Sequence, residues 1–359
     1  MSLIKNAKEL VLLVVLCLII AIIDIGYGGF RLGITGAVKK DMKRLDEEIK
    51  KGRQETVSSS PTELVARVKS TSEIVLTWKD NSEEDGFKIE RKVQNGSYNQ
   101  INTVNQNITS YSDTELNIDT RYYYRIRAYK GTANSSYSNE VYAKTLAGIY
   151  NSPSGSPSGL AWDGTNLWSC DSFTGKIYKH NMDATLSVAN TYDAPGGSDK
   201  HPTGLAWDGS NLWSCNLYTD KIYKHNMDAT LSIDASYDIR WLTNDIDGLT
   251  WDGTNLWSCA SYGSKAIWKH NMDATLSIAA TYVSEDGGIA DLAWDGSNIF
   301  SLRTYYAIFK HKMDANLSVI SIYEFEQPDD PITDIPSGLT WDGNYFWSCD
   351  TQTDKIYKH

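Results

Sequence analysis

One hexapeptide, Gly159-Leu-Ala-Trp-Asp-Gly164, returns with small changes through the C-terminal part of this chain of 359 residues. Its tryptophan recurs at Trp207, Trp251, Trp294 and Trp341, at intervals of 45, 44, 43 and 47 residues. Each copy leads into Asn-Leu-Trp-Ser-Cys, then Lys-Ile-Tyr-Lys-His-Asn-Met-Asp and Ala-Thr-Leu-Ser, with substitutions. Short apolar runs between turn residues predict four strands per repeat. In the first copy these are residues 159–162, 167–170, 176–180 and 186–192.

Four strands in every 43 to 47 residues are the period of a β-propeller blade. The chain ends at residues 355–359, after the third strand of the fifth repeat, and residues 145–150 have the pattern of an outer strand. We therefore predict that residues 145–150 complete the fifth blade and close a five-bladed ring without an open edge. The repeats also resemble propeller repeats of secreted bacterial and archaeal proteins, and this resemblance implies a fold more than an activity.

The segment before the repeats, residues 58–144, contains short alternating strands between turn clusters. About seven such strands in about 90 residues predict an aligned β-sandwich. The segment resembles the fibronectin type III family. The residues that carry this resemblance are Pro61, Leu64, Trp78, Leu116 and the run Tyr122-Tyr-Tyr-Arg-Ile-Arg-Ala128. The resemblance implies a core position for Trp78 and a bond from the hydroxyl of Tyr122 to nearby backbone. These roles are structural, so the segment is expected to be a spacer or adhesive module.

The N-terminus contains an apolar run of 14 residues, 10–23, which suits either a signal peptide or a short membrane helix. Residues 7–27 are enough to span a membrane, and we favour an uncleaved anchor with the bulk of the chain outside the cytoplasm. A charged segment follows in which apolar residues have heptad spacing, at Val38, Met42, Leu45 and Ile49. Two heptads favour a spacer helix, with self-association through this seam as the alternative.

Charge is unevenly distributed along the chain, which has a net charge of −11. Residues 147–359 carry 13 Lys and Arg against 27 Asp and Glu, a formal charge of −14. An acidic domain of this size repels phosphate backbones, so no nucleic-acid partner is expected.

The fold class that we predict is an all-β ectodomain, a β-sandwich plus a five-bladed propeller, behind an N-terminal membrane or signal helix. The expected segments are 1–30 (anchor or signal), 31–57 (spacer helix), 58–144 (sandwich) and 145–359 (propeller).

Two repeated residue types invite a metal or redox interpretation, but packing explains both better. Four blades share a cysteine at one position, and the remaining blade has Leu302 there: Cys170, Cys215, Cys259 and Cys349. Equivalent atoms on the second strands of a five-fold ring lie roughly 10 Å or more apart, too far for a disulfide. A histidine ends each third strand, still farther from the axis, at His180, His225, His270, His311 and His359. We predict buried thiols, structural histidines and no metal ligation. A repeated aromatic, Trp168 in the first blade, should fill the space between blades.

The loop after each second strand carries the candidate binding residues. An aromatic follows the cysteine position by three residues in four blades, at Phe173, Tyr218, Tyr262 and Tyr305. Flat aromatic faces beside acceptors such as Asp171, Asn216 and Asp350 are what a sugar-binding subsite requires. Several weak equivalent sites would then act together by multivalency. The alternative is that these aromatics only cover blade edges.

Two acidic residues break the repeat near the expected axis, Asp247 and Asp291. Paired carboxylates are the equipment of glycoside cleavage, so a glycoside hydrolase-like or glutaminyl-cyclase-like enzyme is the alternative function. That alternative predicts a deep axial pocket lined by Asp247 and Asp291.

No cofactor is expected, although the Asp-rich loops leave Ca²⁺ open as a ligand. The function that we predict is a non-enzymatic, membrane-anchored binding or scaffold protein, with a glycan or protein at the cell surface as partner. It would act as a recognition head or as an accessory subunit of a surface assembly.

Overall fold

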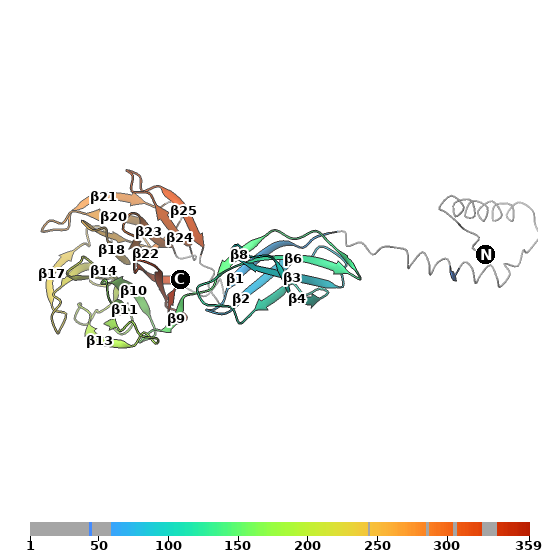
Figure 1. Cartoon of the computed structure of the whole chain (residues 1–359). Coiled ribbons are helices and arrows are strands. Elements are labelled where there is room, and N and C mark those ends of the chain that lie inside the picture. Colours follow the sequence, from blue (N-terminus) through green and yellow to red (C-terminus); the bar gives the residue numbers. More distant parts are fainter. Residues whose placement is uncertain (1–42, 45–58, 243–244, 285–286, 304–306, 325–335) are drawn as a thin grey trace, which may run out of the picture. The chain divides into compact units, whose positions relative to one another are not determined.

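The structure is a computed structural model that describes residues 43–44, 59–242, 245–284, 287–303, 307–324 and 336–359 (Figure 1). The chain divides into two units, residues 1–56 and 57–359. In the first unit only Lys43 and Arg44 are described, and both are helical. The predicted span at residues 7–27 and the heptad seam at Val38, Met42, Leu45 and Ile49 therefore lie outside the described residues. Among the residues that are described, no helix is long and apolar enough to cross a membrane.

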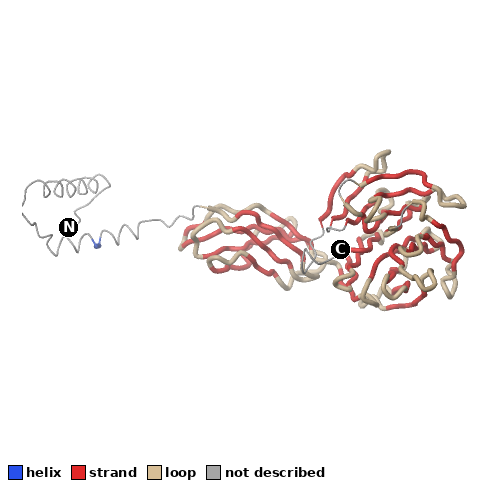
Figure 2. The backbone as a smooth tube through the Cα atoms, turned by 180° about the vertical axis from the view of Figure 1, so that it is seen from behind, coloured by secondary structure: helices blue, strands red, loops and turns tan. Residues whose placement is uncertain are grey.

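Beyond residue 58 the described chain consists of strands and loops (Figure 2), so the all-β prediction is confirmed for this part. Residues 62–144 form a β-sandwich of two antiparallel sheets. One sheet has the order β1-β2-β5, and in the other β4-β3-β6 continues to β7 while β8 also pairs with β6. The strands are β1 (Thr62–Val68), β2 (Ile74–Lys79), β3 (Gly86–Val93), β4 (Asn99–Asn105), β5 (Ser110–Asp113), β6 (Arg121–Lys130), β7 (Ala133–Asn134) and β8 (Val141–Lys144).

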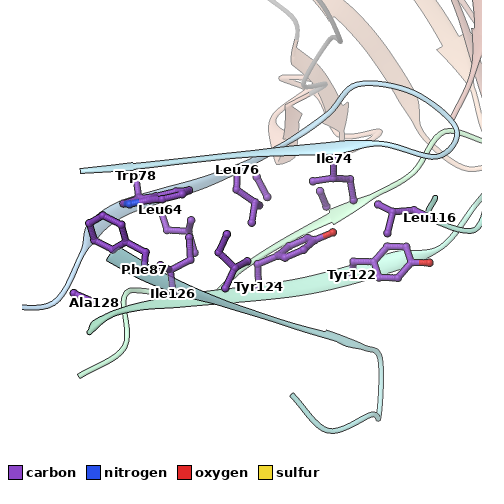
Figure 3. Close-up of a cluster of buried hydrophobic side chains, with 13 residues drawn as sticks. Leu64, Ile74, Leu76, Trp78, Phe87, Leu116, Tyr122, Tyr124, Ile126 and Ala128 are labelled. Atoms are coloured by element: carbon purple, nitrogen blue, oxygen red, sulfur yellow. The ribbon is translucent and has the colours of Figure 1, made fainter. Parts of the chain in front are cut away.

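The sandwich core follows from the two-residue alternation of its strands. In β6, Tyr122, Tyr124, Ile126 and Ala128 are buried, and the residues between them face outward. Trp78 lies in this core with its ring edge-on to Phe87, at a centroid distance of 5.5 Å (Figure 3). The backbone N–H of Asn117 donates to the hydroxyl of Tyr122 at 2.9 Å. Both structural roles predicted for Trp78 and Tyr122 are confirmed.

The repeats form five four-stranded antiparallel sheets. We number these sheets one to five along the chain and call them together the ring. Their strands are β10 (Pro157–Trp162), β11 (Leu167–Asp171), β12 (Lys176–His180) and β13 (Val188–Asp193); β14 (Pro202–Trp207), β15 (Leu212–Asn216), β16 (Lys221–His225) and β17 (Ile233–Asp238); β18 (Gly248–Trp251), β19 (Leu256–Cys259), β20 (Ala266–His270) and β21 (Ile278–Val283); β22 (Ile289–Trp294), β23 (Ile299–Arg303), β24 (Ala307–His311) and β25 (Val319–Glu324); and β26 (Pro336–Trp341), β27 (Phe346–Asp350), β28 (Lys355–Lys358) and β9 (Gly148–Asn151).

The first strands of the five sheets lie side by side in a closed, propeller-like circuit. Strand β10 contacts both β14 and β26, and the contacts β14 to β18, β18 to β22 and β22 to β26 complete the circuit. The fifth sheet is closed by β9, which pairs antiparallel with β28, with Tyr150 opposite Ile356. The segment ahead of the repeats therefore supplies the missing fourth strand, as predicted. The strand itself is shorter than expected, because Thr145 bonds to the backbone of Thr120 in the sandwich.

The outer strands begin later than the repeat pattern predicted. In the first sheet the expected start was Leu186, whereas β13 begins at Val188. Leu186 has a φ of 54° and is buried at the end of a turn. The carboxylate of Asp183 accepts the backbone N–H groups of Thr185 and Ser187 at 3.0 Å, which holds this turn closed. The leucine is thus a core residue of the turn and not of the strand.

Neighbouring sheets pack through repeated side chains. One cluster joins Trp168 and Ile177 of the first sheet to Leu205, Leu212 and Leu231 of the second. The indole N–H of Trp168 donates to Asp163 at 2.9 Å, so its polar atom is satisfied although the ring is buried. The prediction that these tryptophans fill the space between sheets is confirmed. Burying each large side chain contributes on the order of 2 kcal/mol to stability.

Candidate binding face of the ring

One end of the ring gathers the loops that differ between sheets. In the first sheet Asp171, at the end of β11, lies opposite Pro157 of β10 and Lys176 of β12, and Lys176 lies opposite Asp193 of β13. The loops after the second and fourth strands therefore share one end with the start of the first strand. We call this end the loop face. It contains the sequence-predicted aromatics that the structure describes.

The aromatics at the loop face are exposed. Phe173, Tyr218 and Tyr262 expose 84%, 65% and 71% of their surface, and Tyr305 lies outside the described residues. Large apolar groups in water are unfavourable unless a partner covers them. Two further apolar side chains are exposed at this end, Trp241 after β17 and Val283 at the end of β21. The repeat pattern did not predict them, because the position of Val283 is acidic in three other sheets, as Asp193, Asp238 and Glu324.

The polar residues expected beside these aromatics do not face solvent. Asp171, Asn216 and Asp350 are all buried, which corrects the prediction that they offer acceptors to a ligand. Asp171 accepts the backbone N–H of Ser156 at 2.8 Å and of Thr174 at 2.6 Å. Burial raises the pKa of Asp171, but hydrogen bonds to its carboxylate outweigh burial and leave the pKa below its usual value. These side chains shape the loops from inside, since a tight loop needs its backbone N–H groups satisfied.

Tyr218 of the loop face is stacked on a neighbouring ring. Its ring stacks on His201 with a centroid distance of 4.3 Å and an interplanar angle of 22°. Burial lowers the pKa of His201, so the imidazole is neutral at pH 7 and the pair is an uncharged platform. Nearby in sequence, Lys200 and Lys176 both contact the exposed carboxylate of Asp193, at 2.9 and 3.0 Å. Flat neutral rings with charged groups at the rim can bind a sugar ring or an apolar protein surface.

Near the axis, hydroxyl groups join consecutive sheets. Ser158 donates to the carbonyl of Pro202 in the second sheet at 2.7 Å, and Thr203 donates to Ile246 at 2.9 Å. Ser337 of the fifth sheet donates in the same way to Pro157. The third and fourth sheets have Asp247 and Ala290 at this position, so they lack the hydroxyl.

Asp291 makes hydrogen bonds between the sheets that lack this hydroxyl. It is completely buried, and its carboxylate accepts three backbone N–H groups, from Leu292 at 2.8 Å, Leu249 at 3.2 Å and Leu339 at 2.7 Å. These belong to the fourth, third and fifth sheets, so one side chain joins three sheets. The position is glycine in the other four sheets. A Cβ added at Gly248 would lie 2.4 Å from Oδ1 of Asp291, so the space near the axis accommodates this side chain alone.

Asp247 has a different environment. Its Oδ2 accepts the backbone N–H and the hydroxyl of Ser261, at 2.6 and 2.5 Å. Burial raises its pKa to about 6, although both bonds from Ser261 oppose that shift. The cavity that the structure describes at the axis, of about 80 Å³, lies at the opposite ends of the first strands. Its lining includes the five repeated tryptophans but neither Asp247 nor Asp291: Trp162, Trp207, Trp251, Trp294 and Trp341.

The repeated thiols and imidazoles are internal. All four ring cysteines are free and buried, and burial raises the pKa of each. His180 lies between the hydroxyl of Ser169 at 2.8 Å and the carbonyl of Leu186 at 3.1 Å. Because a carbonyl only accepts, Nδ1 carries the proton and Nε2 accepts from Ser169. Among the described residues, no three or more His, Cys, Asp or Glu side chains are placed to share a metal ion.

The sandwich matches a known domain family. Its residues 59–144 match the fibronectin type III domain family. Residues 59–144 are a fibronectin type III domain. The chain is similar to the solved fibronectin type III domain of human contactin 1, at 24% identity and a TM-score of 0.25, over 28% of this chain and 87% of that one. A Fn3-like protein from Clostridium thermocellum gives 29% identity and a TM-score of 0.22, over 23% and 88% of the two chains.

The chain is similar to Myxococcus xanthus glutaminyl cyclase at 9% identity and a TM-score of 0.49, over 59% of this chain and 94% of that one. No curated protein matches the chain.

Proposed function

We propose that the protein is an extracytoplasmic binding or scaffold protein whose ring recognises a glycan or protein partner at the cell surface. A fibronectin type III domain is typical of extracellular proteins with binding or scaffold roles, and this supports the location. The proposal includes anchoring through residues 7–27. It also includes the assignment of the ring as a five-bladed propeller of the secreted repeat type.

The observation that carries the proposal is the exposure of equivalent aromatics at the loop face. Phe173, Tyr218 and Tyr262 come from the same loop of three successive sheets, and all three are open to solvent. Aromatic side chains are enriched at recognition surfaces because a rigid ring buries a large area with little loss of conformational entropy. Three equivalent positions also favour a partner that repeats its own groups, because weak contacts then add through multivalency.

The proposal includes no catalytic step. The carboxylate of Asp291 is buried and bonded to three backbone N–H groups, which supports a structural role for it. Asp247 is bonded to Ser261 of its own sheet. A general acid and base acting on a glycosidic bond must both reach the substrate.

The test is binding of the full chain, in detergent micelles, to an array of neutral and charged glycans. Tyr218→Ala and Tyr262→Ala should each weaken binding about fivefold, which corresponds to about 1 kcal/mol for an exposed aromatic contact. The double variant should lose more than tenfold. Ile233→Ala removes an exposed apolar side chain from β17 and is the matched control, expected to bind unchanged.

An array without any bound glycan would remove the glycan as partner. If a ligand is found and the Tyr218, Tyr262 double variant binds it unchanged, the loop face is not the recognition surface.

A further inference from the structure

The outer face of the larger sheet in the fibronectin type III domain is unusually basic. On β6 the residues that point away from the core include Arg121, Arg125 and Arg127, and on β3 they include Lys88 and Lys92. Glu90 is the only acidic residue on either strand. We call these five basic residues the basic track. In the rest of the domain acidic groups cluster in loops, as at residues 80–85.

Strand register places like charges opposite each other on this face. Lys88 of β3 is the partner of Arg127 of β6, and Arg121 of β6 is the partner of Lys144 of β8. Directly opposite like charges destabilise a sheet by several tenths of a kcal/mol per pair. A sheet surface that only had to stay soluble would pair opposite charges instead. Lys144 contacts Asp119, and Lys92 of the basic track contacts Glu140 at 3.5 Å, so these two lysines already have acidic partners. The other like-charge pair, Lys88 opposite Arg127, favours a ligand that neutralises it.

The centre of the basic track is rigid. The guanidinium of Arg125 lies between the rings of Tyr98 and Tyr137, at 4.0 and 3.8 Å from their centroids. It also donates to one oxygen of Glu90 through Nε at 2.9 Å and Nη2 at 2.7 Å. Arg127 contacts the other oxygen of Glu90 at 3.1 Å. Two guanidinium groups thus share a single carboxylate, so positive charge remains in excess and is held in place before any ligand arrives.

Glu90 is ionised in this environment. Burial raises its pKa, but bonds from Tyr137 and Arg125 and the charges of Arg125 and Arg127 outweigh burial and leave the pKa below its usual value. The phenol of Tyr137 donates to Glu90 at 2.8 Å. Glu90 is therefore an internal acceptor that holds the guanidinium groups of Arg125 and Arg127 in place.

The basic track has the shape of an extended chain. Arg121 and Arg127 are six residues apart on one strand, a separation of about 20 Å at about 3.3 Å per residue. Alternate residues on one face are about 6.6 Å apart, and β3 runs alongside β6 at about 4.8 Å. A linear ligand with regularly spaced negative groups fits such a track, whereas a single small anion would meet only part of it.

The aromatic rings of this face indicate whether a nucleic acid or an anionic polysaccharide fits it better. Tyr98 and Tyr137 are covered by Arg125, and Lys92 lies 5.1 Å from the centroid of Tyr123. Single-stranded nucleic acids need uncovered rings for base stacking. Tyr142 of β8 is 60% exposed on this face, with Arg121 at 4.9 Å from its centroid, whereas the rings of Tyr98 and Tyr137 are covered. A polysaccharide needs only the charges, so the covered rings favour it.

We propose that the basic track binds a linear anionic polysaccharide that carries carboxylate, sulfate or phosphate groups. This site lies on the fibronectin type III domain, so it is independent of the loop face of the ring. The ring is acidic and repels the same polymer, which restricts such a ligand to the basic track.

The experiment measures binding of the full chain in detergent micelles to immobilised dextran sulfate, carboxymethyl dextran and unmodified dextran at 0.15 M NaCl. Binding is expected to both anionic dextrans and not to the neutral one. Arg121→Gln and Lys88→Gln should each reduce affinity at least threefold, and the double variant at least tenfold, since each loses one ionic contact. Both side chains alternate with core residues of their strands and point away from the sandwich core, so the fold should persist, as checked by circular dichroism.

Matched controls come from the opposite sheet of the same domain. Arg67→Gln on β1 and Lys79→Gln on β2 remove the same charges from exposed positions and should change affinity less than 1.5-fold. Equal losses in the controls would mean that only net charge matters, which overturns the proposal. Absence of binding to both anionic dextrans, or equal binding to neutral dextran, would also overturn it. So would tighter binding to single-stranded DNA, or self-association in sedimentation that the Arg121, Lys88 double variant abolishes.

Discussion

Replacement of Asp291 by alanine should destabilise the ring by about 3 kcal/mol. The carboxylate accepts backbone N–H groups from Leu249, Leu292 and Leu339, which belong to three different sheets. A typical buried hydrogen bond contributes about 1 kcal/mol net, and an N–H left without a partner costs about 1 to 3 kcal/mol. Burial holds the pKa of Asp291 well above its usual value, so burying the carboxyl is itself costly. Part of that cost is recovered in the variant, and we therefore use the lower figure of about 1 kcal/mol per bond.

The assay is urea denaturation of the full chain followed by tryptophan fluorescence. Every tryptophan except Trp78 lies in residues 147–359, so the signal reports mainly on the ring. A loss of about 3 kcal/mol corresponds to a fall in Tm of about 6 to 12 °C for a domain of this size. Asp291→Asn retains one acceptor oxygen and should give an intermediate loss.

The matched control is Asp247→Ser, which restores the hydroxyl of the other sheets and loses only the bonds to Ser261. Its stability should change by less than about 1 kcal/mol. If Asp291→Ala were as stable as the natural chain or more stable, the reasoning would be refuted. The buried carboxyl would then be retained at a cost to stability, as expected of a group that serves chemistry.

Three further predictions concern the ring. Strand β9 is the edge strand of the fifth sheet, so of two consecutive residues one directs its N–H toward β28. Replacing both Ile149 and Tyr150 with proline removes that ladder N–H and should lower the Tm of the ring by at least 5 °C, whereas an unchanged Tm would mean that β9 does not close the fifth sheet. In a Cys17→Ser background, the four ring cysteines should react with a thiol reagent only after denaturation, and rapid modification of the native chain would contradict their burial. The histidines that end the third strands of sheets one to four have pKa values lowered by burial, so the unfolded chain takes up protons first as the pH falls. Ring stability should therefore decline below about pH 6.5, and Tm values that stay equal at pH 7.5, 6.5 and 5.5 would exclude this linkage.

Several features of the protein could be read from the sequence because they depend on short-range spacing. The interval between Trp162 and Trp207 contains four strand patterns, and the same number of strands forms each sheet. Alternation along β6 separates core residues such as Tyr124 from outward ones such as Arg125. The replacement of a repeated cysteine by Leu302 indicated an apolar slot, and the four cysteines are indeed buried and free.

Other features were decided only by tertiary structure. Asp171 follows an apolar strand and resembles an exposed loop acid in sequence, but it faces inward because its loop needs an internal acceptor. Asp291 resembled a catalytic carboxylate, yet two of its partners lie 42 and 48 residues away and are aligned only by ring closure. The like-charge pair Lys88 and Arg127 exists only in the register of two strands that are not adjacent in sequence. Local patterns determine which way a strand presents its side chains, whereas the environment of a buried charge depends on distant segments that only the folded chain brings together.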